Sequence, residues 1–200
     1  MLRGARANAG SRQAGAQGQR PDEARLIDKI AEGDVRAFEE LYRAYHPRLT
    51  QFLINMTRRM HLVEEILDDT MMVVWERPES YAGASKFSTW IFAIAYRKAL
   101  RALRRNDEPV EDPAADLRAS AEPWPDHELE RVQTHELLFG ALGELSPEHR
   151  AVVDLAYFHE AGYREIAEIM NCPVDTVKTR MFHARRRLRS KLAGDFSDWI

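Results

Sequence analysis

The chain has 200 residues, and its lysines and arginines (29) and aspartates and glutamates (32) give a formal net charge of −3. That length allows one large or two small domains. The single cysteine, Cys172, excludes an internal disulfide and indicates a reducing compartment. No run of 18 apolar residues could span a membrane, and the arginine-containing N-terminus lacks the apolar segment of a secretory signal. We therefore expect a cytoplasmic protein without membrane insertion.

The front of the chain is predicted to be a tail followed by short helices. Residues 1–22 are mostly alanine, glycine, glutamine and arginine, which have little to bury, so we expect a disordered tail. Helical periodicity follows and stops at Gly33. Asp34 suits the N-cap of a second helix, which His46-Pro47 is expected to break before a third helix begins.

Residues 62–77 predict a strong helix with one buried side, which consists of Val63, Leu67, Thr70, Met71 and Val74. The far side carries what we call the docking stripe: Glu65, Asp68, Asp69, Met72 and Glu76. A solvated face explains carboxylates alone, but a methionine among them favours a protein docking surface, because Met adapts to irregular contacts. No histidine or further acid stands at ligand spacing, so we expect no metal site.

Pro78 ends that helix, and a loop with Gly83 at its tip leads into a helix rich in aromatic residues. Six basic residues and no acid lie between residues 86 and 105. One side of this helix carries Phe87, Trp90 and Ile94 and grades into cations. Such a side suits single-stranded nucleic acid, because bases stack on rings and charges hold the backbone. The alternative is a mostly buried helix with a solvated basic end.

Residues 106–131 differ in composition, with nine acids, two arginines and four prolines. This composition predicts an extended, flexible acidic linker between two domains. Such a linker could occupy a channel built for nucleic acid, or it could keep two basic faces apart. The composition leaves both alternatives open.

The second domain is expected over residues 132–195. Ser146-Pro147-Glu148 is a helix start, with the serine as N-cap and proline at the first helical position. Gly162 precedes a predicted helix-turn-helix over residues 163–192. The second helix of this motif has seven basic residues and no acid between residues 176 and 191. One of its sides carries Val174, Val177, Met181, Ala184 and Leu188, and the other is centred on Thr179, Phe182, His183 and Arg186.

One side of that helix therefore packs, and the other offers donors, cations and an exposed ring. A helix that enters the DNA major groove needs both, since cations neutralise phosphates while polar and flat side chains meet base edges and thymine methyls. A basic amphipathic helix on a solvated surface is the alternative. Phe182, in the middle of the polar side, favours DNA binding.

No enzyme signature is present in the sequence. Two His-Glu pairs, at positions 127 and 135, begin like a zinc-protease motif, but Arg131 and Phe139 stand where the second histidine is required. The chain also lacks a phosphate-binding glycine loop and a nucleophile elbow. We expect neither enzymatic activity nor a cofactor.

An all-α chain of two small helical domains on a flexible acidic linker, the C-terminal one a helix-turn-helix, resembles bacterial RNA polymerase sigma factors. It is most similar to the small extracytoplasmic-function group of the sigma-70 family. The motifs that carry the resemblance are GDVRAFEELYRAYHPRL, VEEILDDTMMVVW, FSTWIFAIAYRKAL and LSPEHRAVVDLAYFHEAGYREIAEIMNCPVDTVKTRMFHARRRL. Together they cover residues 26–192, with the linker excepted.

The resemblance implies a region 2 domain over residues 23–105 and a region 4 domain over residues 132–195. The docking stripe would bind the clamp of the largest subunit of core polymerase, and the flap of the second-largest subunit is a further implied contact. Loop 81–86 and the next helix would capture a flipped base of the −10 element and help melt it, through Tyr81, Lys86, Phe87, Trp90, Arg97, Lys98 and Arg101. The −35 residues would be Lys178, Thr179, Phe182 and His183 on bases and Arg180, Arg185 and Arg186 on phosphates.

The chain departs from the family pattern at two positions. Many relatives carry an asparagine where this chain has Arg97 and an acid where it has Ala84, so its −10 preference is left open. The resemblance also implies an anti-sigma partner, because relatives are commonly held inactive by one. A free-standing helix-turn-helix regulator is the alternative from another class, although it leaves the docking stripe and the aromatic helix without a role.

Overall fold

A computed structural model describes residues 23–105, which we call the front module, and residues 140–196, the rear module. The regular structure in these two ranges is entirely helical. The expected tail 1–22, the expected linker 106–131 and the start of the second domain lie outside them. The helices are α1 (Glu23–Ala31), α2 (Val35–Thr57), α3 (Met60–Glu76), the 3₁₀ turn η1 (Pro78–Ser80), α4 (Phe87–Arg105), α7 (Pro147–Tyr157), α8 (Tyr163–Met170) and α9 (Val174–Phe196).

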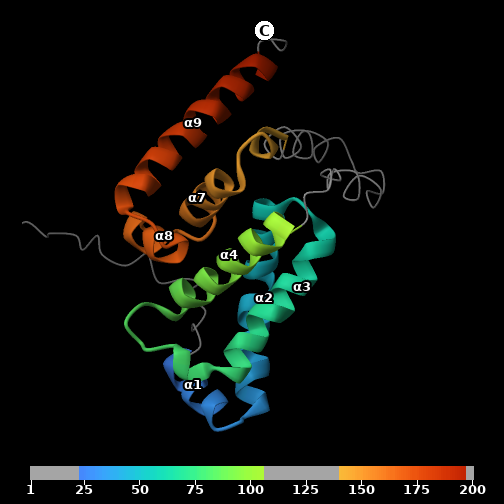
Figure 1. The fold of residues 1–200 in the computed structure, drawn as a ribbon, viewed down its shortest axis with the longest axis vertical. Coiled ribbons are helices and arrows are strands. Elements are labelled where there is room, and N and C mark those ends of the chain that lie inside the picture. Colours follow the sequence, from blue (N-terminus) through green and yellow to red (C-terminus); the bar gives the residue numbers. More distant parts are fainter. Residues whose placement is uncertain (1–22, 106–139, 197–200) are drawn as a thin grey trace, which may run out of the picture.

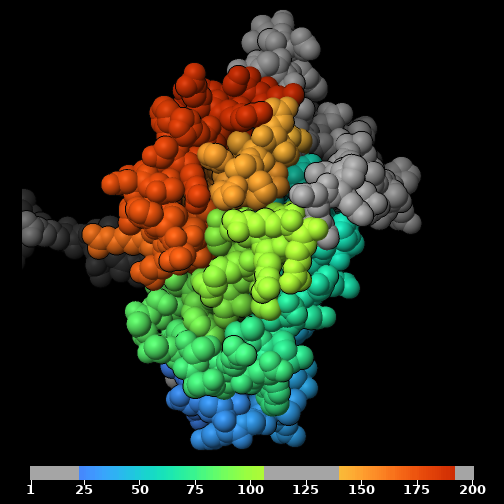
Figure 2. All heavy atoms as spheres, viewed as in Figure 1, coloured from blue at the N-terminus to red at the C-terminus, as the bar shows by residue number. Residues whose placement is uncertain are grey.

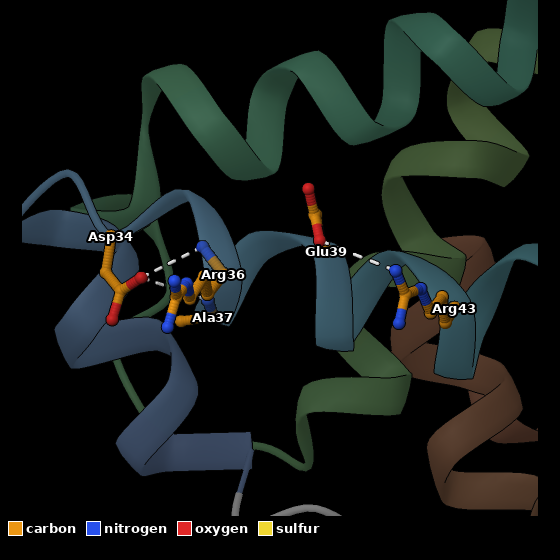
Figure 3. A network of polar contacts seen from close by, with 5 residues as sticks. All are labelled: Asp34, Arg36, Ala37, Glu39 and Arg43. Carbon is orange, nitrogen blue, oxygen red and sulfur yellow. Dashed lines mark hydrogen bonds and ion pairs between the residues drawn. The ribbon is translucent and has the colours of Figure 1, made fainter.

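The start of α2 follows the prediction from sequence. Gly33 adopts a φ of +84°, which suits glycine at the end of α1. The Asp34 side chain then accepts hydrogen bonds from the backbone N–H groups of Arg36 (2.9 Å) and Ala37 (3.3 Å), as Figure 3 shows. One turn further on, Arg43 and Glu39 form an exposed ion pair of 3.5 Å. Asp34 is confirmed as the N-cap.

The predicted break at His46-Pro47 is wrong, because α2 runs without interruption for 23 residues and contains Pro47. Pro47 itself is exposed. The same helix buries a continuous apolar face on both sides of the proline: Leu41, Tyr45, Leu49, Phe52, Leu53 and Met56. Burial of that face stabilises the helix by more than the proline, at about 3 kcal/mol, destabilises it.

The core of the front module lies between α2, α3 and α4. The predicted buried side of α3 is confirmed, since Val63, Leu67, Thr70, Met71 and Val74 are all buried. Aromatic rings from α2 and α4 meet edge to face, Phe52 on Phe92 at 5.2 Å and Tyr45 on Phe87 at 5.2 Å between centroids. Edge-to-face rings at this distance pack favourably.

The rear module is built from α7, α8 and α9. Ser146 is confirmed as the N-cap of α7, and Gly162 is the N-cap of α8, where the Glu165 carboxylate accepts from the Gly162 N–H at 2.9 Å. Asn171 ends α8 with a φ of +48°, and the turn leads directly into α9. The predicted packing side of α9 is confirmed, with Val177, Met181 and Ala184 buried.

The two modules lie in contact, an arrangement that the sequence left open. Helix α8 packs on α4 and α7 packs on α2 (Figure 1), and the space-filling view shows the rear module seated on α4 (Figure 2). We call this contact the seam. Within the described ranges, no helix has the length and apolar character needed to cross a bilayer.

Candidate nucleic-acid and protein interfaces

Five side chains on α9 form an exposed surface that we call the recognition face: Lys178, Thr179, Phe182, His183 and Arg186. Phe182 is 63% exposed, which is unusual for a phenylalanine that directly follows a buried residue, Met181. Lys178 and Thr179 make only contacts within the helix, Nζ to the Asp175 carboxylate (2.9 Å) and Oγ1 to the Asp175 carbonyl (2.9 Å). Both side chains therefore remain accessible to a ligand.

Two further arginines of α9 point elsewhere. Arg180 is half-buried, its Nη1 lies 3.7 Å from Cys172 Sγ, and its charge acts on Tyr96 of α4, whose pKa is raised to about 12 by burial. Arg185 lies over the Tyr157 ring and donates from Nε to the Tyr157 hydroxyl at 3.1 Å. In this arrangement Arg180 faces the seam, so the expected phosphate contact by Arg180 requires a change of position.

A hollow of 470 Å³ lies beside the recognition face, between α9 and the first turn of α7. His149 and His183 meet there with ring centroids 6.5 Å apart, and Ser146 Oγ lies 2.7 Å from His149 Nδ1. Burial and the positive charge of Arg180 lower the pKa of His149. His149 is therefore mostly neutral at pH 7, and no motif in the sequence pointed to it.

The loop before α4 is held by an aromatic cluster. The Tyr81 ring contacts both Phe87 and Trp90 at 5.5 Å, and its hydroxyl donates to the Ser85 carbonyl at 2.8 Å. Phe87 is only 1% exposed, because it also packs on Tyr45 in the core. Tyr81 and Trp90 are half-buried and reach the surface. Phe87 was expected to contact the −10 strand, but in this conformation it is buried and supports the rings of Tyr81 and Trp90.

The cations expected on α4 lie in different surroundings. Arg97 and Arg101 are exposed. Lys98 is paired with Asp69 of α3 at 2.9 Å, beside a 350 Å³ groove between the two helices. Lys86 is paired with Glu165 of the rear module at 2.5 Å. Two of these four cations are therefore already matched with a carboxylate.

The docking stripe is exposed along α3, and Met72 is 51% exposed. Aromatic side chains of α2 continue this surface, which the sequence analysis missed. Trp75 packs edge to face on Phe38 at 5.3 Å, and Phe38 lies 6.3 Å from Tyr42. Tyr42 has a raised pKa, through burial first and then through the negative charges of Asp68 and Glu64. Carboxylates here surround a partly exposed apolar strip.

Two family descriptions match the chain: Sigma-70 region 2 over residues 41–108, and Sigma-70, region 4 over residues 135–188. A curated relative, the ECF RNA polymerase sigma factor SigM of Bacillus subtilis, is 31% identical over 155 residues, which is 76% of this chain and 93% of SigM. The chain belongs to the extracytoplasmic-function group of the sigma-70 family.

Other members of this sigma-factor group agree. RpoE of Cereibacter sphaeroides, an ECF RNA polymerase sigma factor, is 29% identical over 163 residues, which is 80% of this chain and 88% of RpoE. Among solved structures, CnrH in complex with the cytosolic domain of CnrY has a TM-score of 0.64 and 26% identity, and the match covers 87% of this chain and 98% of CnrH. The all-helical fold agrees with these relatives.

The region 2 match contains the docking stripe, the aromatic loop and α4, and the region 4 match contains α7, α8 and the recognition face. The sigma factor thus presents an acidic surface on α3 and a basic surface on α9. No cluster of three or more metal-ligating side chains occurs in the described ranges 23–105 and 140–196.

Phe38 and Tyr42 were missed because their helical spacing is the same as that of core residues. Both share α2 with the fully buried Leu41 and Tyr45, and only packing separates the half-buried pair from the buried pair. His149 carried no signal, because a single histidine near a helix start is not a motif. Its significance depends on His183, which lies far away in the sequence.

Proposed function

We propose that this sigma factor binds core RNA polymerase, directs it to promoters with −35 and −10 elements, and helps to open the DNA. The observation that carries the proposal is the recognition face, where a 63% exposed Phe182 lies among Lys178, Thr179, His183 and Arg186. An exposed phenylalanine contributes little to the stability of the fold. Apolar contact with a thymine methyl group or a base edge gives this side chain a role.

The −35 contacts follow from the chemistry of that face. Lys178, Thr179 and His183 offer hydrogen-bond donors to base edges, and Arg186 offers a charge to a phosphate. Arg185 stays beside Tyr157 at the edge of this surface. Arg180 faces the seam, so we propose that it contacts a phosphate only after it moves away from that position.

The −10 contacts are assigned to the loop and the exposed part of α4. Tyr81 and Trp90 supply ring surface on which a displaced base can stack, while Arg97 and Arg101 hold the backbone of the strand. Phe87 fixes the two rings from below. Lys86 and Lys98 become available to the strand only when they exchange Glu165 and Asp69 for phosphates.

Core polymerase is assigned to the docking stripe and the apolar strip beside it. Met72, Trp75 and Phe38 supply adaptable apolar contact, and the carboxylates of Glu65, Asp68, Asp69 and Glu76 supply complementarity to a basic partner. By resemblance that partner is the clamp of the largest subunit, with the flap of the second-largest subunit as a second contact. The site of action is the cytoplasm.

The double substitution Asp68→Lys/Asp69→Lys tests the docking assignment. Reversing two exposed charges should weaken binding to purified core polymerase at least about 100-fold, measured by co-purification and by fluorescence anisotropy. Circular dichroism should be unchanged, because both side chains are exposed. The control is Glu168→Lys, a single charge reversal at an exposed position on α8 of the rear module, which changes the net charge by +2 against +4 for the double variant.

If Glu168→Lys weakened binding to core polymerase as much as the double variant does, the loss would come from overall charge and not from contacts of the docking stripe. Tight binding to duplex DNA without any association with core polymerase would overturn the proposal and favour a free-standing helix-turn-helix regulator.

Regulation by a second protein is part of the proposal. CnrH, which covers most of this chain at a TM-score of 0.64, was solved in complex with the cytosolic domain of CnrY. This likeness supports a protein partner for the present chain, and by resemblance to the family that partner would be an anti-sigma factor. Co-expression of an adjacent reading frame, followed by co-purification, tests whether such a partner binds.

A further inference from the structure

A cavity of 190 Å³ lies where the first turn of α4 meets the loop between α7 and α8. Arg48 of α2 and Thr89 of α4 line it from the front module, and His159 and Glu165 line it from the rear module. Helices α4 and α8 pack on each other beside it (Figure 1). Of the side chains assigned above to DNA or to polymerase, only Lys86 lines this cavity, so those assignments do not account for it.

The N-terminus of α4 faces this cavity without a side-chain cap. The Lys86 carbonyl accepts from the Trp90 N–H at 3.2 Å, which places Lys86 at the N-cap position. A lysine side chain has no hydrogen-bond acceptor, and the first turn of α4 contains no acid. The backbone N–H groups of Ser88 and Thr89, which line the cavity, have no partner in the described part of the chain. Unpaired N–H groups and the positive end of the helix dipole favour an anion.

Thr89 adds an unpartnered hydroxyl at the same place. The residue is 4% exposed, yet its hydroxyl makes no hydrogen bond within residues 23–105 and 140–196. Thr70 of α3 is also buried, but its hydroxyl donates to the Ile66 carbonyl at 2.7 Å. Thr89 lies in the first turn of its helix and has no helical carbonyl behind it. Because buried polar groups have partners, the Thr89 hydroxyl needs one from inside the cavity.

Arg48 contributes a positive charge that no carboxylate of the described residues neutralises. Its guanidinium carbon lies 5.0 Å from the Tyr45 ring centroid and 5.6 Å from that of Phe92. The two rings attract the cation and fix its position, but they supply no negative charge. The planar donors of a guanidinium group match the oxygens of a phosphate.

Two acids also line the cavity, and neither neutralises Arg48. Glu165 uses both oxygens, since Oε1 pairs with Lys86 and Oε2 accepts from the Gly162 N–H at 2.9 Å. Lys86 first, and the Gly162 hydrogen bond second, lower the pKa of Glu165, so this carboxylate is ionised at neutral pH. Glu160 is exposed to solvent. An anion in the cavity therefore meets an unneutralised cation, whereas a cation meets no buried carboxylate that lacks a partner.

The His159 ring closes the cavity on the side of the rear module. Its centroid lies 4.5 Å from that of Phe92, and its Nε2 is 3.1 Å from Asp154 Oδ2. Asn55 of α2 donates from Nδ2 to the other oxygen of that carboxylate at 2.5 Å. Asp154 itself does not line the cavity, so its negative charge lies behind the ring.

We infer that this cavity binds the phosphate group of a small molecule, through the backbone N–H groups of Ser88 and Thr89, the Thr89 hydroxyl and the Arg48 guanidinium. We call it the phosphate site. The inference goes beyond the proposed function and does not depend on it, because it concerns a ligand that neither polymerase nor promoter supplies.

The volume of the phosphate site limits the size of its ligand. Sites for drug-sized molecules occupy about 300–1,000 Å³, so 190 Å³ suits a single phosphate group with a small remainder and not a nucleotide. Inorganic phosphate and a small phosphate monoester share this chemistry. A phosphate of a DNA strand carries one charge and two bulky substituents, so an enclosed site favours the free dianion.

Isothermal titration calorimetry of the full chain with inorganic phosphate tests the inference, with potassium chloride of matched ionic strength as the reference. We expect one saturable site that depends on Thr89 and Arg48. The melting temperature should be higher in phosphate than in chloride, because a ligand that binds only the folded state stabilises it. Parallel titrations with glycerol phosphate and with a short single-stranded oligothymidylate distinguish the sources of the phosphate group.

Three variants locate the site. Thr89→Val removes the hydroxyl with little change of volume and should raise the Kd for phosphate about tenfold, because a hydrogen bond to a charged group is lost. Arg48→Gln removes the charge and should raise the Kd by at least about the same factor. Thr176→Val is the matched control, because Thr176 is the third residue of α9 as Thr89 is of α4, and it lies outside the cavity. Its Kd should equal that of the wild type, and circular dichroism confirms that all three variants are folded.

Three results would overturn the inference. Phosphate that acts no differently from chloride would mean that water fills the cavity. Wild-type Kd values for both Thr89→Val and Arg48→Gln would place the bound phosphate elsewhere, such as on the basic side of α9. Oligothymidylate affinity that falls with Thr89→Val as phosphate affinity does would assign the site to a DNA strand and not to a small molecule. None of these measurements involves polymerase or a promoter, so failure of the proposed function would leave the phosphate site unaffected.

Discussion

Met181 and Phe182 are neighbours on α9 that meet opposite surroundings. Met181 is 1% exposed in the core of the rear module, and Phe182 is 63% exposed on the recognition face. We expect Phe182→Ala to change the free energy of unfolding by no more than about 0.5 kcal/mol, because the ring has little to lose. The same variant should weaken binding to a duplex selected from a random pool by about 1–3 kcal/mol, measured by fluorescence anisotropy.

Met181→Ala is the matched control for that prediction. It should cost about 2–5 kcal/mol of unfolding free energy, measured by urea denaturation, because it leaves a cavity in the core. DNA binding by the fraction that remains folded should stay near the wild-type value. If Phe182→Ala bound every duplex with wild-type affinity, Phe182 would have no role in DNA binding.

Pro47 and Pro147 lie in α-helices, at positions where a proline has opposite effects on stability. Pro47 lies in the interior of α2, where it removes the hydrogen bond to the Arg43 carbonyl, whereas Pro147 lies in the first turn of α7, where no such bond is lost. We expect Pro47→Ala to raise the free energy of unfolding by about 1–2 kcal/mol, since the regained bond outweighs the greater freedom of the unfolded chain. Pro147→Ala should give no gain. Thermal melts of both variants measure the difference.

A Pro47→Ala variant no more stable than the wild type would mean that α2 accommodates the proline without cost. The outcome also bears on how α2 holds its place, because this one helix contributes to the front core and, through Asn55 and the Met56 carbonyl, to the seam.

Local rules predicted the helix starts and the faces of the helices, because a cap or a periodic face depends on residues a few positions apart. Asp34 and Ser146 were predicted for this reason, and so was the packing side of α9. The expected break at Pro47 failed, since tertiary burial of α2 outweighed a local preference. Phe87 and Arg180 were predicted to contact DNA, but Phe87 is buried in the core and Arg180 faces the seam. Helical periodicity alone cannot distinguish these positions from exposed ones.

At the scale of the whole molecule, contacts between residues far apart in sequence decide the arrangement. Nothing in the neighbourhood of Asn55 predicts Asp154 as its partner, and the same holds for Lys86 and Glu165. A polar residue on a helix face reads as solvated until its partner is known. The sequence therefore predicted the two modules but could not predict the contact between them.

Charge also has to be considered at this scale, because its distribution matters more than its sum. The net charge of −3 would repel a polyanion, yet many of the acids lie in segment 106–131 and on α3, whereas the bases are concentrated on α9. DNA affinity should therefore fall steeply with salt, since each phosphate contact releases counterions. Arg186→Gln should reduce the slope of log K against log salt concentration by about one, measured on a random-sequence duplex.

Arg43→Gln removes the same unit of charge from an exposed site on α2, where Arg43 pairs only with Glu39. If local charge governs binding, this variant should leave the slope unchanged within error, because salt screens charges beyond about 10 Å. Equal reductions for both variants would mean that the protein responds to DNA through its overall charge. A reduction for Arg186→Gln alone places a phosphate at the recognition face, next to the side chains that are proposed to contact bases.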